Sequence, residues 1–109
     1  MSIMIRQPDD MHVHLRQELM LATVLPFTSS VFRRAVVMGN LPTSITTAKN
    51  VEWYRKEIIR QAPDFEPIMS IMLTNSTTPE IVRKANQAGA KVLKLILVIL
   101  QQIQQKAYP

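Results

Sequence analysis

The chain has 109 residues, of which 47% are hydrophobic and 19% are charged, a balance that excludes a disordered chain and fits one small globular domain. The absence of cysteine excludes a disulfide scaffold. The formal net charge is +5, but the cations are scattered along the chain, so the composition argues against a nucleic-acid-binding surface.

Strand-like apolar runs alternate with helix-like patterns along the chain. We predict strands over residues 4–15, 34–38, 67–73 and 91–96, and helices over residues 19–32, 48–61 and 78–88. Pro26 is expected to kink or split the first helix. Thr46 or Thr47 can cap the second helix, and Thr78 followed by a proline starts the third. Gly89 is expected to end the third helix.

The β-α-β-α-β-α-β order predicts an α/β fold with a parallel sheet. A small flavodoxin-like sheet and part of a TIM barrel are both compatible with this pattern. Neither a G-x-G-x-x-G nor a G-x-x-x-x-G-K-[ST] loop is present, so the common nucleotide-binding loops are excluded. The longest apolar run, residues 95–100, is too short to cross a membrane, and no signal-peptide pattern opens the chain. We therefore expect a cytoplasmic protein without a membrane partner.

His12 and His14, which are the only histidines, stand two residues apart in the first predicted strand. Residues two apart in a strand point to the same side, so the pair could supply two imidazole ligands to one metal ion. The alternative is an ordinary strand that carries two polar side chains.

Other polar residues follow the predicted strands, at the edge where parallel α/β folds bind ligands: Arg16, Asn40 and Lys94. Lys94 stands within an apolar run, where burial lowers the pKa of an amine and favours its neutral form. A neutral amine can react with carbon dioxide to form a carbamate that bridges two cations. The alternative is a lysine whose stem packs on the sheet while its ammonium group reaches water.

Several motifs in register between residues 5 and 96 resemble the N-terminal part of the shorter bacterial dihydroorotases, in the amidohydrolase superfamily. The matching segments are 5–16 (Ile-Arg-Gln-Pro-Asp-Asp-Met-His-Val-His-Leu-Arg), 34–41 (Arg-Ala-Val-Val-Met-Gly-Asn-Leu), 46–47, 54–55 and 94–95. The resemblance implies an incomplete TIM (β/α)8 barrel, with about the first four strands and three helices. It also implies a zinc centre, with two ions in the intact family site, and a family that forms homodimers.

The resemblance implies specific roles for six residues. His12 and His14 match metal ligands, and Lys94 matches the carboxylated lysine that bridges the metals. His14, Leu15, Arg16 and Asn40 match the substrate-binding segment. The implied reaction is the reversible cyclisation of N-carbamoyl-L-aspartate to L-dihydroorotate in pyrimidine biosynthesis, so the implied partner is a small anionic substrate.

The sequence also departs from the family pattern. The family's Arg-Asp-Gly is replaced by Arg16, Gln17 and Glu18, and its Met-Pro-Asn-Leu has Gly39 in place of the proline. The family's later histidine ligands and its catalytic aspartate have no counterpart, so we assign no catalytic residue. We expect a fragment that is inactive alone and exposes unpaired sheet edges through which it can self-associate. The alternative is a non-catalytic interaction module that needs a complementary chain.

Residues 97–109 do not follow the family, which continues Lys-Leu-x-Pro-x-x-x-Thr-Thr-Asn-Ser-x-x-Gly-Val. One allowed back-translation of this segment, read with a single C restored in front, encodes Pro-Gly-Asn-Thr-Ser-Thr-Asn-Ser-Thr-Lys-Gly-Val-Ser. We therefore predict that residues 1–96 are part of a metal-dependent amidohydrolase barrel and that residues 97–109 are an out-of-frame tail.

Overall fold

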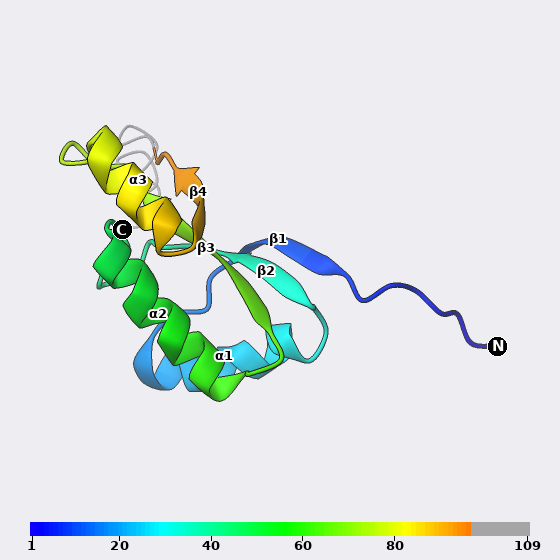
Figure 1. Ribbon diagram of the computed structural model, residues 1–109. Helices are drawn as coiled ribbons and strands as arrows, with labels where there is room; N and C mark the ends of the chain where they lie inside the picture. Colours follow the sequence, from blue (N-terminus) through cyan, green and yellow to red (C-terminus); the bar gives the residue numbers. More distant parts are fainter. Residues whose placement is uncertain (97–109) are drawn as a thin grey trace, which may run out of the picture.

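The computed structural model describes residues 1–96, which form a parallel sheet with three helices packed on one face (Figure 1). The strands are β1 (Asp9–Val13), β2 (Arg34–Val37), β3 (Glu66–Met72) and β4 (Ala90–Lys94). The helices are α1 (Glu18–Ser29), α2 (Ala48–Gln61) and α3 (Pro79–Gln87). All the predicted elements are present, and the largest difference is that the first strand begins at Asp9 rather than at residue 4. The predicted out-of-frame tail lies outside the described residues.

The order of strands in the sheet decides between the two folds that the sequence pattern allowed. The strands lie side by side in chain order, β1-β2-β3-β4, and each neighbouring pair is parallel. Successive right-handed crossovers in one direction place every helix on the same face, as in a TIM barrel. A flavodoxin-like sheet reverses direction and has helices on both faces. The described residues therefore form part of a barrel, which confirms the predicted fold class.

The main hydrophobic core lies between the sheet and the helices. Alternate strand residues point into it, including Val37 of β2 and Met69 and Ile71 of β3. These meet buried side chains from the helices, among them Leu21 of α1 and Tyr54 of α2. The intervening strand residues point to the opposite face, which is the concave side of the sheet and the interior of an intact barrel.

The concave face has a buried centre of its own. Four residues there are less than 9% exposed: Val36, Met38, Ser70 and Met72. The three apolar ones, Val36, Met38 and Met72, do not belong to the main core. The Ser70 hydroxyl donates a hydrogen bond of 2.6 Å to the carbonyl of Val37. This bond satisfies a polar group that burial would otherwise penalise.

Local signals in the sequence explain where the helices begin and end. The Thr47 hydroxyl accepts a hydrogen bond from the N–H of Asn50 at the start of α2, and the Thr78 hydroxyl accepts one from Ile81 at the start of α3. Gly89 has a φ of +111°, which glycine adopts without strain, directly after α3. Pro26 does not split α1, because buried side chains on both sides of it hold one continuous helix to Ser29.

Candidate functional site

The two histidines converge at the carboxyl end of β1. His12 lies in the strand and His14 follows its last residue, while the alternate side chains, Val13 and Leu15, pack against or within the core. The Nε2 atoms of the two histidine rings lie 3.1 Å apart, and the ring centroids are separated by 5.0 Å. His12 is exposed and His14 is half-buried, so a ligand can reach both nitrogens from solvent.

This spacing fits a shared metal ion. Zinc binds imidazole nitrogen at about 2.0–2.1 Å, and two nitrogens 3.1 Å apart would then subtend an angle of roughly 100° at the ion, close to tetrahedral. In the absence of a metal, one ring nitrogen must donate and the other must accept, since two N–H groups would repel each other at this distance. The geometry of the pair is therefore compatible with two of the four positions of a tetrahedral set.

The surroundings of His14 favour its neutral form. Burial is the main cause that lowers the pKa of His14, and the positive charges of His12, Arg16 and Lys94 lower it further. A neutral imidazole is the form that binds a metal, because the ligating nitrogen must carry a free lone pair. The site thus disfavours the proton that would compete with a cation.

Lys94 faces the same space as the histidine pair. It is the last residue of β4 and lies beside Met72 of β3, whose side chain belongs to the concave face. Its side chain is half-buried, and its charge is close enough to act on His14, although β1 and β4 are the two edges of the sheet. The fold therefore places Lys94 on the same face of the sheet as the histidine pair.

The predicted substrate-binding residues lie on the loops that follow β1 and β2. Arg16 is exposed and has a φ of +61°, a left-handed conformation that is uncommon for a residue other than glycine. Asn40 is also exposed. The preceding Gly39 packs closely, since a Cβ atom there would lie 3.0 Å from the Cβ of Ile45 and 3.3 Å from the carbonyl oxygen of Ser70.

Leu15 is placed differently from the other predicted site residues. Its side chain is 0% exposed and belongs to the main core, on the opposite side of the backbone from His14. A contact between this side chain and a ligand on the concave face is therefore excluded. If Leu15 contacts a substrate, as the resemblance implies, the contact must come from its backbone.

Two further residues, Tyr54 and Gln17, hold the loop after β1, and the sequence analysis assigned no role to either of them. The Tyr54 hydroxyl of α2 donates a hydrogen bond to the carbonyl of Arg16. The side-chain oxygen of Gln17 accepts a hydrogen bond of 3.2 Å from the N–H of Thr43. Tyr54 is spaced like an ordinary core residue on its helix, so the sequence carried no signal of this contact.

Within residues 1–96, no group of three or more His, Cys, Asp or Glu side chains is arranged to hold a metal ion. The histidine pair therefore remains a candidate site, with Lys94 as the third candidate ligand. Among the same residues, no helix combines the length and the apolar character needed to cross a bilayer.

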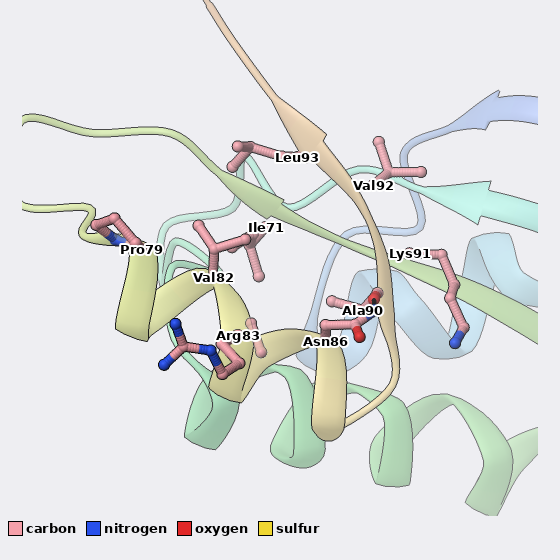
Figure 2. Close-up of a pocket in the computed structure, with 10 residues that line it drawn as sticks. Ile71, Pro79, Val82, Arg83, Asn86, Ala90, Lys91, Val92 and Leu93 are labelled. Carbon is pink, nitrogen blue, oxygen red and sulfur yellow. Dashed lines mark hydrogen bonds between the residues drawn. The ribbon is translucent and has the colours of Figure 1, made fainter.

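A separate hollow lies on the helix side of β4. This cavity has a volume of about 370 Å³ and lies between α3 and β4, and Figure 2 shows the residues that line it. Its lining is mainly apolar and includes Ile71, Val82 and Leu93, and Arg83 and Lys91 add two cationic side chains to it. Because it lies across the sheet from His14, it is not part of the candidate metal site.

Comparison with known proteins points to one group of enzymes. No model of a protein family matches the chain. The chain is 43% identical over 90 residues to a dihydroorotase from Alkalilimnicola ehrlichii, 41% over 97 residues to one from Teredinibacter turnerae and 50% over 78 residues to one from Yersinia pestis. These matches cover 80%, 86% and 69% of this chain but only 26%, 28% and 22% of the relatives.

Solved structures lead to the same group. A dihydroorotase from Campylobacter jejuni superimposes with a TM-score of 0.73 and 28% identity, over 82% of this chain and 27% of the other. A dihydroorotase from Saccharomyces cerevisiae, solved in complex with 5-fluoroorotic acid, superimposes with a TM-score of 0.77 and 32% identity, over 83% of this chain and 25% of the other. The chain thus spans about a quarter of the length of the relatives that it matches.

Proposed function

Because this chain is homologous to dihydroorotases over most of its length, we propose that it supplies part of the metal and substrate site of a dihydroorotase. The reaction is the reversible cyclisation of N-carbamoyl-L-aspartate to L-dihydroorotate in pyrimidine biosynthesis, with zinc as the metal and the cytoplasm as the location. The observation that carries the proposal is the 3.1 Å approach of the His12 and His14 Nε2 atoms on the concave face, where the charges of Arg16 and Lys94 also act.

Each side chain has a defined task in this proposal. His12 and His14 would hold a zinc ion, and Lys94, as a carbamate, would add oxygen ligands. Zinc bound there would supply the Lewis acidity needed to polarise the substrate carbonyl and to activate water. Arg16 offers a planar guanidinium that can bind the substrate carboxylate through two parallel hydrogen bonds. The Asn40 amide adds a donor to the same carboxylate.

The proposal also explains why we expect no turnover from this chain alone. The chain carries no counterpart of the family's later histidine ligands or of its catalytic aspartate. The described residues form four strands, whereas the barrel closes with eight. We therefore propose that proton transfer to the leaving nitrogen depends on a residue that this chain does not supply.

Zinc binding tests the first half of the proposal. The purified chain should bind zinc in a calorimetric titration, and Co²⁺ should give the absorption bands of a nitrogen-ligated ion. His12→Asn and His14→Asn should each weaken binding by more than about tenfold, since losing even an outer-shell partner of a ligand costs that much. Asn40→Ala is the matched control and should bind zinc like the parent chain. Equal zinc affinity in all four proteins would contradict the proposed ligands.

Complementation tests the second half. The chain is mixed with zinc, L-dihydroorotate and a fragment of the Yersinia pestis dihydroorotase that contains the part this chain does not match. Ring opening should appear only when both chains are present, and His14→Asn should abolish it. Turnover by the chain alone would show that the described strands are sufficient, and no turnover in the mixture would contradict the assignment.

A second candidate function is a non-catalytic interaction module. Among the described residues, β1 and β4 each pair with a neighbour on one side only, and both edge strands carry exposed apolar side chains, including Met11 and Leu93. The apolar cavity in Figure 2 lies beside the β4 edge. Light scattering over a range of chain concentrations distinguishes a monomer from a self-associated form. Activity of the complex with the Yersinia pestis fragment would instead favour the enzyme assignment.

The tail hypothesis has a direct test in the coding DNA. If residues 97–109 are out of frame, the DNA should lack one base relative to an intact relative, directly after the codons for residues 94–96. A coding sequence that aligns with its relatives without a missing base would contradict the hypothesis.

A further inference from the structure

The loop after β1 contains two residues whose backbone conformation is unfavourable for their residue type. Arg16 and Glu18 have φ values of +61° and +56°, and they are the only residues other than glycine with positive φ in the part of the chain that the structure describes. Such conformations persist only where the surroundings impose them. Some contact must therefore hold Arg16 in this geometry.

Three contacts fix the loop, and each reaches a different part of the fold. Leu15 is buried in the main core. The side chain of Gln17 is tied to the N–H of Thr43 in the loop before α2. The Tyr54 hydroxyl donates to the carbonyl of Arg16, from a residue 38 positions further along the chain. Only the last of these contacts acts on Arg16 itself.

Tyr54 is well suited to act as a fixed donor. Its side chain is 1% exposed, and its ring stacks on that of Trp53 with centroids 5.8 Å apart. Burial raises the pKa of the Tyr54 phenol, whereas the positive charge of Arg16 opposes that shift. The hydroxyl therefore keeps its proton at physiological pH and remains a hydrogen-bond donor to the carbonyl.

Arg16 is linked to the loop and to the site by two observations. Its carbonyl accepts the hydrogen bond from Tyr54, and its positive charge contributes to lowering the pKa of His14, two residues before it. We propose that Tyr54 is a positioning residue: by holding the Arg16 carbonyl, its hydroxyl directs the Arg16 guanidinium toward the concave face, where it receives the carboxylate of the substrate. The carboxylate part of this inference rests on the proposed function.

The alternative is that Tyr54 only fills the core. Tyr54→Phe separates the two roles, because it keeps the ring and removes only the hydroxyl. Ser70→Ala is the matched control, since it removes another buried hydroxyl that donates to a backbone carbonyl, that of Val37, away from the β1–α1 loop. Both variants lose one buried hydrogen bond, so a general loss of stability should appear in both.

Backbone chemical shifts give a readout that needs no ligand. The ¹³Cα and ¹³Cβ shifts of Arg16 in the full chain should indicate a left-handed conformation, and Tyr54→Phe should move them toward those of an extended or right-handed residue. Ser70→Ala should leave them unchanged. Shifts that remain left-handed in Tyr54→Phe would overturn the proposal, whatever the chain binds.

Ligand binding gives the second readout. Trp53 is the single tryptophan, and it lines a surface hollow of about 250 Å³ together with Gln17, Glu18 and Tyr54, so its fluorescence reports on this loop. With zinc present, L-dihydroorotate should change the fluorescence of the parent chain, and dihydrouracil, which lacks the carboxylate, should bind more weakly.

The variants should then separate the two proposals. Tyr54→Phe should weaken dihydroorotate binding by about tenfold, the equivalent of one well-placed hydrogen bond, and should leave zinc affinity and dihydrouracil binding unchanged. Equal dihydroorotate affinity in the parent chain and in Tyr54→Phe would overturn the positioning role. If the parent chain binds zinc but binds L-dihydroorotate no more tightly than dihydrouracil, the proposed substrate site is wrong. The ¹³C chemical shifts of Arg16 then decide by themselves whether Tyr54 positions the loop.

Discussion

The junction between β1 and α1 and the junction between β3 and α3 perform the same task in opposite ways. Both turn the chain from the carboxyl end of a strand into a helix. At the β3–α3 junction, Thr78 caps the helix, Pro79 occupies its first position, and the Thr77 hydroxyl accepts a hydrogen bond of 2.9 Å from the N–H of Thr74. Every local preference there agrees with the structure.

The β1–α1 junction violates these preferences. Its cap residue, Gln17, makes no side-chain bond to the helix, because its amide oxygen is used by Thr43. Arg16 and Glu18 both have left-handed backbones. The junction that carries candidate site residues is thus held by distant contacts, while the junction without them follows local rules. Local conflict of this kind is expected at functional sites, where geometry is selected over stability.

The largest expected effect comes from the core anchor of the strained junction. Leu15→Ala should lower the free energy of unfolding by about 2–5 kcal/mol, because it leaves a cavity at a fully buried position. Leu19→Ala is the matched control, since Leu19 is 86% exposed on α1 and should change stability little. Urea unfolding measures both, and similar losses in the two variants would show that the loop is not anchored through Leu15.

The regular junction should depend on its cap. Thr78→Ala should lower the free energy of unfolding by about 0.5–2 kcal/mol, since it removes the hydroxyl that accepts the N–H of Ile81. Thr78→Ser keeps that hydroxyl and should stay close to the parent chain. If both variants lose the same amount in thermal unfolding, the cap does not account for the order of this junction.

The strain at the first junction should be relieved by one substitution. Glu18→Gly should raise the free energy of unfolding by about 1 kcal/mol, because glycine adopts a φ near +56° without steric cost. Glu52→Gly, the same change within α2, should lower it by about 1 kcal/mol, since glycine is a poor helix former. Changes of opposite sign in the free energy of unfolding, measured with guanidinium, would support the comparison. A loss of stability in both variants would contradict it.

The smallest effect concerns the start of β1, which is held by an exposed ion pair. The guanidinium of Arg34 donates hydrogen bonds of 3.1 and 2.5 Å to the Asp9 carboxylate, and the side-chain hydrogen bond from Arg34 is the main cause that lowers the pKa of Asp9. A lowered folded-state pKa means that this contribution is present above the ordinary value of 3.8 and is lost as the pH falls through the folded-state value.

Thermal midpoints measured between pH 5 and pH 2.5 check this contribution. Asp9→Asn should show a slightly weaker loss of stability over that range than the parent chain, because the substituted side chain no longer titrates. The difference should shrink in high salt, since salt screens exposed charges. Identical pH profiles would show that the ion pair contributes nothing to the start of the strand.

Much of the local structure could be predicted from residues alone. The periodicity of residues 48–61 predicted α2 to the residue, and Thr78 and Gly89 marked both ends of α3. Capping, proline and apolar spacing act over a few residues, which is why a single sequence reveals them. The shared direction of His12 and His14 follows from strand geometry in the same way.

The sequence by itself therefore determined the elements, the histidine pair and the resemblance to dihydroorotases. Tertiary structure decided that the strands lie in sequential order, that Leu15 enters the core, and that the hydroxyl of Tyr54 holds Arg16. These features join residues far apart in the chain, so their energies depend on how the sheet and helices pack. No local pattern encodes a contact between a helix and a loop 38 residues before it, because only the folded backbone brings the two groups together.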